Sequence, residues 1–193
     1  MKNKQAVIIK QLTDRELMFS LVSTQFLVIA AASVLGFFLF DGISSFTDLF
    51  QFNKDIFLVG GTAGVLVVLL DVFFMKVLPP SVQDDGGINE RIFTSLTYPM
   101  IFVIALLVAI SEEVLFRGVI QTHIGLLWAS LIFAMVHYRY LFNWFLFFNV
   151  MLLSFLIGMI YEWTHNLLVT IFMHFVIDFV LGVIVKKKGE RKL

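Results

Sequence analysis

Three ionisable side chains lie close together at the end of an apolar run. Glu112, Glu113 and Arg117 directly follow the apolar residues 100–110. Near the centre of a membrane helix a carboxylate or guanidinium costs roughly 2.5 to 3.5 kcal/mol, whereas a Leu, Ile, Val or Phe returns only about 0.3 to 0.6 kcal/mol. Charged residues kept at that cost indicate a function, so the group is a candidate active site.

The spacing gives these three side chains different surroundings. Glu113 and Arg117 stand at helical positions i and i+4, so they can form an ion pair that lowers the cost of burying both. Glu112 points about 100° away and lacks that partner. A carboxylate without a counter-charge in a low-dielectric setting can exchange a proton near neutral pH, as a general base must. The alternative is that all three are solvated charges at a water-facing helix end.

Two further pairs contain a histidine. Phe133 precedes His137 by one helical turn, and His174 precedes Asp178 by one turn within the apolar run 167–185. Taken alone, a histidine on an apolar face is more often structural than functional. Together, two carboxylates and two imidazoles on three hydrophobic helices are the groups needed to activate a water and stabilise a tetrahedral oxyanion, with or without a metal.

The three motifs and their order resemble a family of intramembrane proteases. Glu-Glu-x-x-x-Arg at 112–117, Phe-x-x-x-His at 133–137 and His-x-x-x-Asp at 174–178 are similar to the motifs of the type II CAAX prenyl endopeptidase and bacteriocin-processing family, called CPBP or Abi. The resemblance covers roughly the C-terminal half, and residues 1–95 match only as hydrophobic helices. It implies a helical membrane peptidase.

The resemblance also implies a role for each motif position. Glu112 corresponds to the general base that activates water, with His137 sharing it. The pair His174 and Asp178 corresponds to the oxyanion-stabilising positions. Family members often have Asn at the last position, and an ionised Asp accepts hydrogen bonds but does not donate them. We therefore expect Asp178 to orient and charge His174. The supporting positions are Glu113, Arg117 and Phe133.

The sequence leaves open whether this site holds a metal ion. The family includes members described as metallo- and as glutamate-type proteases, and Glu112, His137 and His174 could hold Zn²⁺ with one open water position. No His-Glu-x-x-His run is present. Because the candidate ligands lie on three separate helices without a compact motif, we favour a metal-independent site.

The elements that must position these residues are membrane helices. Of 193 residues 60% are hydrophobic, and 23 are Phe. The sequence predicts an all-α, polytopic helical bundle with about six segments, at 17–40, 56–78, 96–110, 124–136, 141–161 and 167–185. A span needs about 20 residues, so the segment near 124–137 is too short to cross alone and is predicted to be tilted or re-entrant. Residues 1–95 form N-terminal helices and a polar linker, residues 96–193 form the catalytic core, and both belong to one membrane domain.

Local signals mark where these segments begin and end. Thr13 and Glu16 resemble a capping box that opens the first helix, and Pro79 and Pro80 close the second. The first segment is longer than the apolar part of a signal peptide, so we interpret it as a retained span.

Charge placement predicts the topology and the partners. Lys and Arg gather at both ends of the chain, which predicts a multi-pass protein of the cell membrane with both termini in the cytoplasm; the residues are Lys2, Lys4, Lys10, Arg15, Lys186, Lys187, Lys188, Arg191 and Lys192. A net charge of zero and no basic patch elsewhere argue against nucleic acid. Asp71 is interpreted as a snorkelling charge. Gly60 and Gly64 allow close packing within the chain or a homodimer.

The favoured function is an endopeptidase that cleaves membrane-associated or lipidated proteins or peptides. One alternative is a catalytically silent membrane scaffold or bacteriocin-immunity protein, in which the same motifs hold the fold together. Another alternative is a small proton-coupled transporter. Two observations argue against it: the charges gather in one half of the chain, and the sequence shows no two-fold repeat.

Overall fold

The structure is a computed structural model that describes residues 11–83, 85–138, 140 and 143–191. Every regular element within these residues is a helix, which confirms the predicted all-α class. In chain order they are α2 (Asp14–Leu39), α3 (Ile43–Thr47), the π-helix η1 (Ile56–Gly61), α4 (Thr62–Val77), α5 (Pro80–Gln83), α6 (Ile88–Ser95), α7 (Tyr98–Glu113), the π-helix η2 (Val114–Gln121), α8 (Thr122–Val136), α9 (Trp144–Thr164) and α10 (Leu167–Glu190).

Five of the described helical stretches are long and apolar enough to cross a membrane. They are Asp14–Leu39, Ile56–Val77, Tyr98–Val136, Trp144–Thr164 and Leu167–Glu190. Five such stretches in a chain of this length make it an integral membrane protein.

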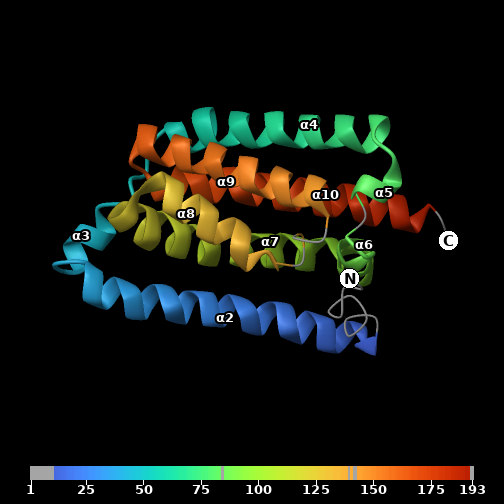
Figure 1. The fold of residues 1–193 in the computed structure, drawn as a ribbon, viewed down its shortest axis with the longest axis horizontal. Coiled ribbons are helices and arrows are strands. Elements are labelled where there is room, and N and C mark those ends of the chain that lie inside the picture. The colour runs from blue at the N-terminus through green and yellow to red at the C-terminus, as the bar shows by residue number, and fades with distance from the viewer. Residues whose placement is uncertain (1–10, 84, 139, 141–142, 192–193) are drawn as a thin grey trace.

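The third stretch contains the predicted short segment. Its backbone leaves helical geometry at Gly125, where φ is 84° and ψ is 168°. Glycine adopts a positive φ without a Cβ penalty, so the chain can turn sharply there. After this turn α8 packs against η2 and α9, and it runs back beside the preceding helix (Figure 1). The short helix predicted near 124–137 is therefore a returning arm.

The predicted helix ends are largely present. Thr13 Oγ1 accepts from the Glu16 amide, and the Glu16 carboxylate accepts from the Thr13 amide, so the capping box is complete. Helix α4 ends at Val77, and its C-cap residue Leu78 directly precedes the two prolines. The polar linker contains the short helices α5 and α6. Lys2, Lys4, Lys10 and Lys192 of the topology prediction lie outside the described residues.

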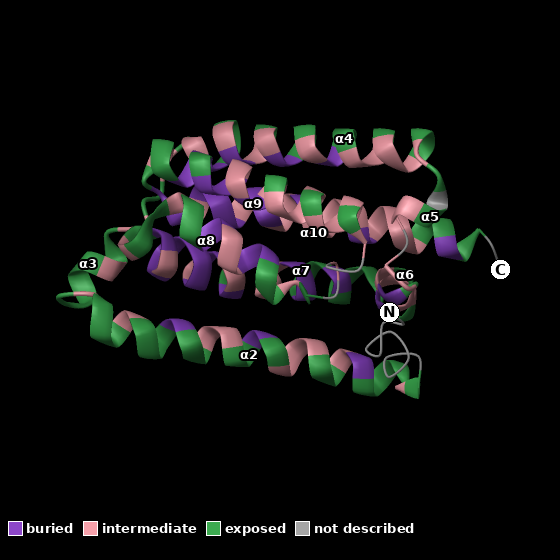
Figure 2. Ribbon diagram, in the orientation of Figure 1, coloured by how far each residue is buried: buried purple, intermediate pink, exposed green. Residues whose placement is uncertain are grey.

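Helix α10 occupies the centre of the bundle. It contacts α7, α4, η1, α6 and α9. Buried residues gather on α7, α8, α9 and α10, whereas α2 and α4 are mostly exposed along the outside (Figure 2). Helix α2 buries Leu17, Gln25 and Ala32 along one face. The motif residues therefore lie on the central helices, and the outer helices face lipid.

The first and last described helices begin and end on the same side of the bundle. Asp14, at the start of α2, pairs with Arg91 of α6 at 2.6 Å. Glu190, at the end of α10, accepts from the hydroxyl of Tyr98 at the start of α7 at 3.0 Å. Because α8 runs back along η2, the chain reverses direction once more within the third stretch, and α10 ends on the side of the bundle where α2 begins (Figure 1).

Glycines let η1 and α4 approach α10 closely. A Cβ at Gly60 would lie 2.4 Å from the carbonyl oxygen of Val169, and one at Gly64 would lie 3.0 Å from that of Met173. The two glycines are thus used for packing within one chain, as small residues commonly are between membrane helices. The homodimer predicted through them stays a prediction.

We expect Gly60→Ala to lower the free energy of unfolding by about 1 to 3 kcal/mol, because the new methyl group meets backbone that cannot move aside. Thermal unfolding of the purified protein in detergent measures the effect. Gly36→Ala is the matched control, since a Cβ there finds its nearest atoms at ordinary distances of 3.7 to 3.9 Å. Equal midpoints for the two variants would contradict this packing.

Candidate active site

The Glu113 carboxylate is one of two fully buried charged groups of the site. Glu113 and Arg117 are each 0% exposed. Glu113 Oε2 lies 3.4 Å from Arg117 Nε, so the predicted i,i+4 ion pair is present. Its other oxygen, Oε1, lies 2.9 Å from Nδ1 of His174 on α10. One carboxylate therefore joins the end of α7, the π-helix η2 and α10.

Arg117 is held by side chains on two helices. Its Nη1 donates to Gln121 Oε1 at 3.2 Å, and its Nη2 donates to Ser154 Oγ of α9 at 2.8 Å. Gln121 in turn donates to the carbonyl of Gly158 at 2.8 Å. Glu113 Oε2 and Arg117 Nε have no hydrogen bond to any described residue. Each therefore depends on the other for its charge partner.

Aromatic contacts set the position of the returning arm α8. The Phe133 and Phe116 rings meet edge to face at 4.8 Å, and the Arg117 guanidinium lies 5.6 Å from the Phe133 ring centroid. Because α8 runs back along η2, one further turn of α8 lies beside the turn that precedes Phe116. This register brings His137 within electrostatic reach of Glu112.

The His137 ring is fixed in one orientation. Its Nδ1 donates to the carbonyl of Phe133 at 2.8 Å. In a neutral imidazole this leaves Nε2 as an acceptor. The ring lies between Phe133 at 4.5 Å and Tyr140 at 6.1 Å, measured between centroids. The half-buried His137 can therefore accept a hydrogen bond from water through Nε2.

Glu112 lies among the other motif residues, and its side chain is partly exposed. It is close enough to interact electrostatically with His137, His174, Asp178 and Glu113. It forms no hydrogen bond or ion pair with any described residue, unlike Glu113. The two neighbouring glutamates thus differ as expected: one is a locked partner in a buried network and the other is available.

His174 lies between two carboxylates. Beyond the bond from Nδ1 to Glu113, its Nε2 lies 3.5 Å from Asp178 Oδ2. The Asp178 side chain is 33% exposed, whereas that of Glu113 is fully buried. The shorter and more buried contact orients the ring. Glu113 therefore supplies the orientation that the sequence interpretation assigned to Asp178, and the Nε2 edge faces the more open side.

The donor atoms do not fit the zinc site that the sequence left open. Within the described part of the chain, no group of three or more His, Asp or Glu side chains is arranged to hold a metal ion. Both nitrogens of His174 already face carboxylates, so this histidine has no open nitrogen for a metal ion.

Several residues of the network were missed by sequence reasoning. Gln121 lies one turn after Arg117, a signal that was present but weak. Ser154 and Gly158 lie in an apolar helix, where a lone small residue is common. A Cβ at Gly158 would lie 2.3 Å from Leu126 and 3.1 Å from Arg117 Nη1, so the glycine makes room for the guanidinium.

The sequence is similar to known proteins over most of its length. The sequence model of the type II CAAX prenyl endopeptidase Rce1-like family matches residues 94–180. An uncharacterized protein of Bacillus subtilis strain 168, YpbD, is 45% identical over 170 residues, which cover 88% of this chain and 90% of that protein. The chain belongs to the Rce1-like family.

The matched region of the Rce1-like family contains every candidate site residue. It runs from the end of α6 to the middle of α10 and leaves α2 and α4 outside. The similarity to YpbD extends over most of the chain, outer helices included. No solved structure matches. Family membership and the five apolar helices together point to a membrane protease.

We expect Arg117→Ala to destabilise the protein by about 3 to 5 kcal/mol, because it leaves a buried carboxylate without its counter-charge. The combined variant Glu113→Gln with Arg117→Met should recover part of this loss, since it removes both charges. Thermal unfolding in detergent measures both.

Asp14→Asn is the control, because it breaks the exposed pair with Arg91 and should cost at most about 1 kcal/mol. If Arg117→Ala were as mild as this control, the buried pair would not support the site.

Proposed function

We propose that this protein is an intramembrane endopeptidase in which Glu112 and His137 activate a water molecule. The observation that carries the proposal is that Glu112 of α7 lies within electrostatic reach of His137, which caps the end of α8, and of His174 on α10. Glu112 is free of partners within the described residues, and Nε2 of His137 is an open acceptor. Two acceptors that face the same space can hold one water between them.

The proposed reaction is ordinary peptide hydrolysis. Glu112 takes a proton as the water oxygen bonds to the carbonyl carbon, and a tetrahedral oxyanion forms. The carbon–nitrogen bond then breaks as the proton passes to the leaving amine. General acid–base catalysis of this kind increases the reaction rate about 10²- to 10⁴-fold.

His174 is proposed to stabilise the oxyanion. Glu113 holds Nδ1 and so fixes the ring. Nε2–H keeps its direction toward the more exposed side, where a substrate oxygen can compete with Asp178 for it. A neutral imidazole has one N–H, so donation at both nitrogens requires the imidazolium form. The two flanking carboxylates favour that cation, and a cationic donor makes a strong hydrogen bond to an oxyanion.

The proposed substrates are membrane-associated or lipidated proteins or peptides, because the site lies among lipid-facing helices. Charge supports an orientation with both chain ends in the cytoplasm. Lys76, Arg91 and the basic residues 186–188 lie at the end of the bundle that holds those ends, whereas Asp41, Asp48 and Asp55 lie at the other.

The decisive experiment compares cells that produce the active protein with cells that produce Glu112→Gln. We expect the variant to lose proteolysis with nearly unchanged stability, because it removes an unpaired charge. Quantitative proteomics of the membranes identifies the substrate, and cleavage by the purified protein checks it. His137→Ala should be as severe, and the double variant no worse than either single one, because the two groups act on one water.

Asp71→Asn and His165→Asn serve as controls, since both change a residue of the same type outside the site. Full activity of Glu112→Gln on an identified substrate would remove the proposed base. A scaffold or immunity protein would show no cleavage difference between active and variant membranes.

Substitution of Asp178 distinguishes a metal-independent mechanism from a metal-dependent one. In a metal-independent site Asp178→Asn should keep or raise activity, because an amide can donate to the oxyanion and Glu113 still orients His174. In a metal site the loss of such a carboxylate would cost about 10- to 100-fold in affinity or activity. Elemental analysis of purified active protein is the second measurement. A stoichiometric transition metal, with activity lost to a chelator and restored by Zn²⁺, would overturn the metal-independent proposal.

A further inference from the structure

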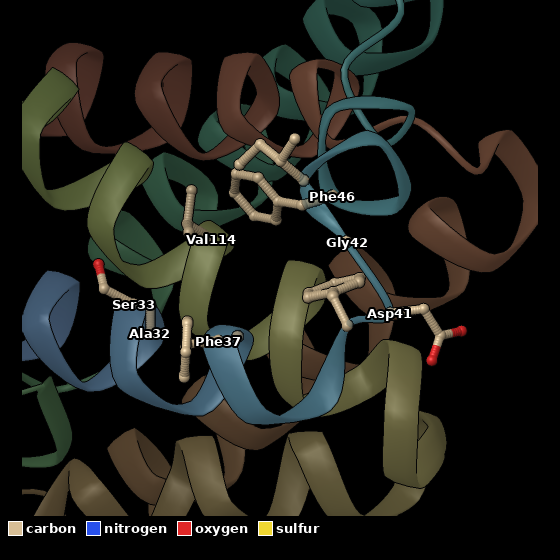
Figure 3. Close-up of a pocket in the computed structure, with 10 residues that line it drawn as sticks. Ala32, Ser33, Phe37, Asp41, Gly42, Phe46 and Val114 are labelled. Carbon is tan, nitrogen blue, oxygen red and sulfur yellow. The ribbon is translucent and has the colours of Figure 1, made fainter.

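A cavity lies outside the candidate active site, between α2 and the core of the bundle. Its volume is about 570 Å³, and its wall includes Ala32, Gly36 and Phe37 of α2, Phe46 of α3 and Val114 of η2 (Figure 3). Val114 follows Glu113 directly, but the Glu113 carboxylate points toward α10. The cavity is therefore not part of the catalytic group.

The cavity extends along α2 from the membrane surface toward the bilayer centre. Asp41 ends the apolar run 17–40, so it marks the surface on the side away from the chain ends. Ala32 lies nine residues earlier on the same helix, about 13 Å deeper at 1.5 Å per residue. Half of the hydrocarbon thickness is about 15 Å. The cavity thus has about the depth of one lipid leaflet.

The chemistry of the wall is apolar, with one charge at the mouth. The Ser33 hydroxyl is already bonded to the carbonyl of Ile29 at 2.9 Å. Asp41 is the charged residue of the lining, and it points outward at one edge of the cavity, opposite Ala32 and Ser33 (Figure 3). It forms no ion pair with another described residue. Asp48 and Asp55 add negative charge to this face, against one Lys54.

We propose that this cavity binds one acyl chain of a bilayer phospholipid whose headgroup carries a primary amine. The chain fills the apolar space between α2 and η2, and the ammonium lies near the Asp41 carboxylate. Anionic headgroups without an amine are disfavoured by the same charge. Helix α2 buries few residues of its own, so the lipid supplies packing that holds α2 against the core. The inference does not depend on the peptidase assignment.

Native mass spectrometry of the full chain tests the proposal, with phosphatidylethanolamine and phosphatidylglycerol of identical acyl chains as probes. We expect wild-type protein to retain phosphatidylethanolamine about two- to fivefold better, the factor typical of an exposed charge contact. Asp41→Asn should remove this preference, whereas Asp48→Asn, which does not line the cavity, should keep it.

Gly36→Leu should abolish retention of both lipids at this site, because a Cβ there fits without a clash and the rest of the side chain fills the cavity. Ala31→Leu adds the same kind of bulk to the outer face of α2 and should change nothing.

Three outcomes would overturn the proposal. The first is equal retention of the two lipids with no effect of Asp41→Asn. The second is displacement of the phospholipid by a farnesylated peptide whose own binding Gly36→Leu blocks, which would make the cavity a site for a substrate's lipid anchor. The third is a change of oligomeric state in Gly36→Leu with no bound lipid, which would assign the surface to a second copy of the chain.

Discussion

The buried Glu113 carboxylate is the constraint on which the arrangement of the central helices depends. It is fully buried between Arg117 and His174, and Arg117 extends the network to Ser154 of α9. A buried charge in a low-dielectric interior persists only when partners surround it. The ends of α7 and η2 must therefore stay next to α10 and α9, and the short helix α8 must return along them to cover the guanidinium with Phe133.

The network gives the adjacent residues Glu113 and Glu112 different roles: Glu113 stabilises the fold, and Glu112 is the proposed general base. Glu113 is bound on both oxygens, so its charge is used to hold helices and to orient His174. Glu112 carries the same carboxylate one position earlier, but it has no hydrogen bond or ion pair with a described residue and is partly exposed. The π-helix η2 begins directly after the pair, and such wide helical turns are frequent at functional sites. A single turn of backbone thus holds one carboxylate in the core and leaves the other partly exposed.

Sequence patterns predicted the features that depend on neighbouring residues. The apolar runs, the capping box of Thr13 and the pair of Glu113 with Arg117 all follow from spacing within one helix. The short length of the segment near 124–137 also required that it return, because it cannot cross a bilayer alone. The bond between Glu113 and His174 could not be predicted in this way, since 61 residues separate them. The i+4 spacing of Asp178 suggested a closer partner for His174 than the structure shows.

The local pair of Glu113 and Arg117 also has a consequence for how the chain is made. During synthesis α7 and η2 reach the bilayer well before His174 has been added, because it lies 61 residues further along. Arg117 is only one turn away, so each charge meets its opposite as soon as the helix forms. Two charges that enter lipid separately would cost several kcal/mol at the helix centre, and pairing within one helix reduces that cost without help from the rest of the protein. The order of residues in this motif therefore lets the helix insert first and acquire its histidine afterwards.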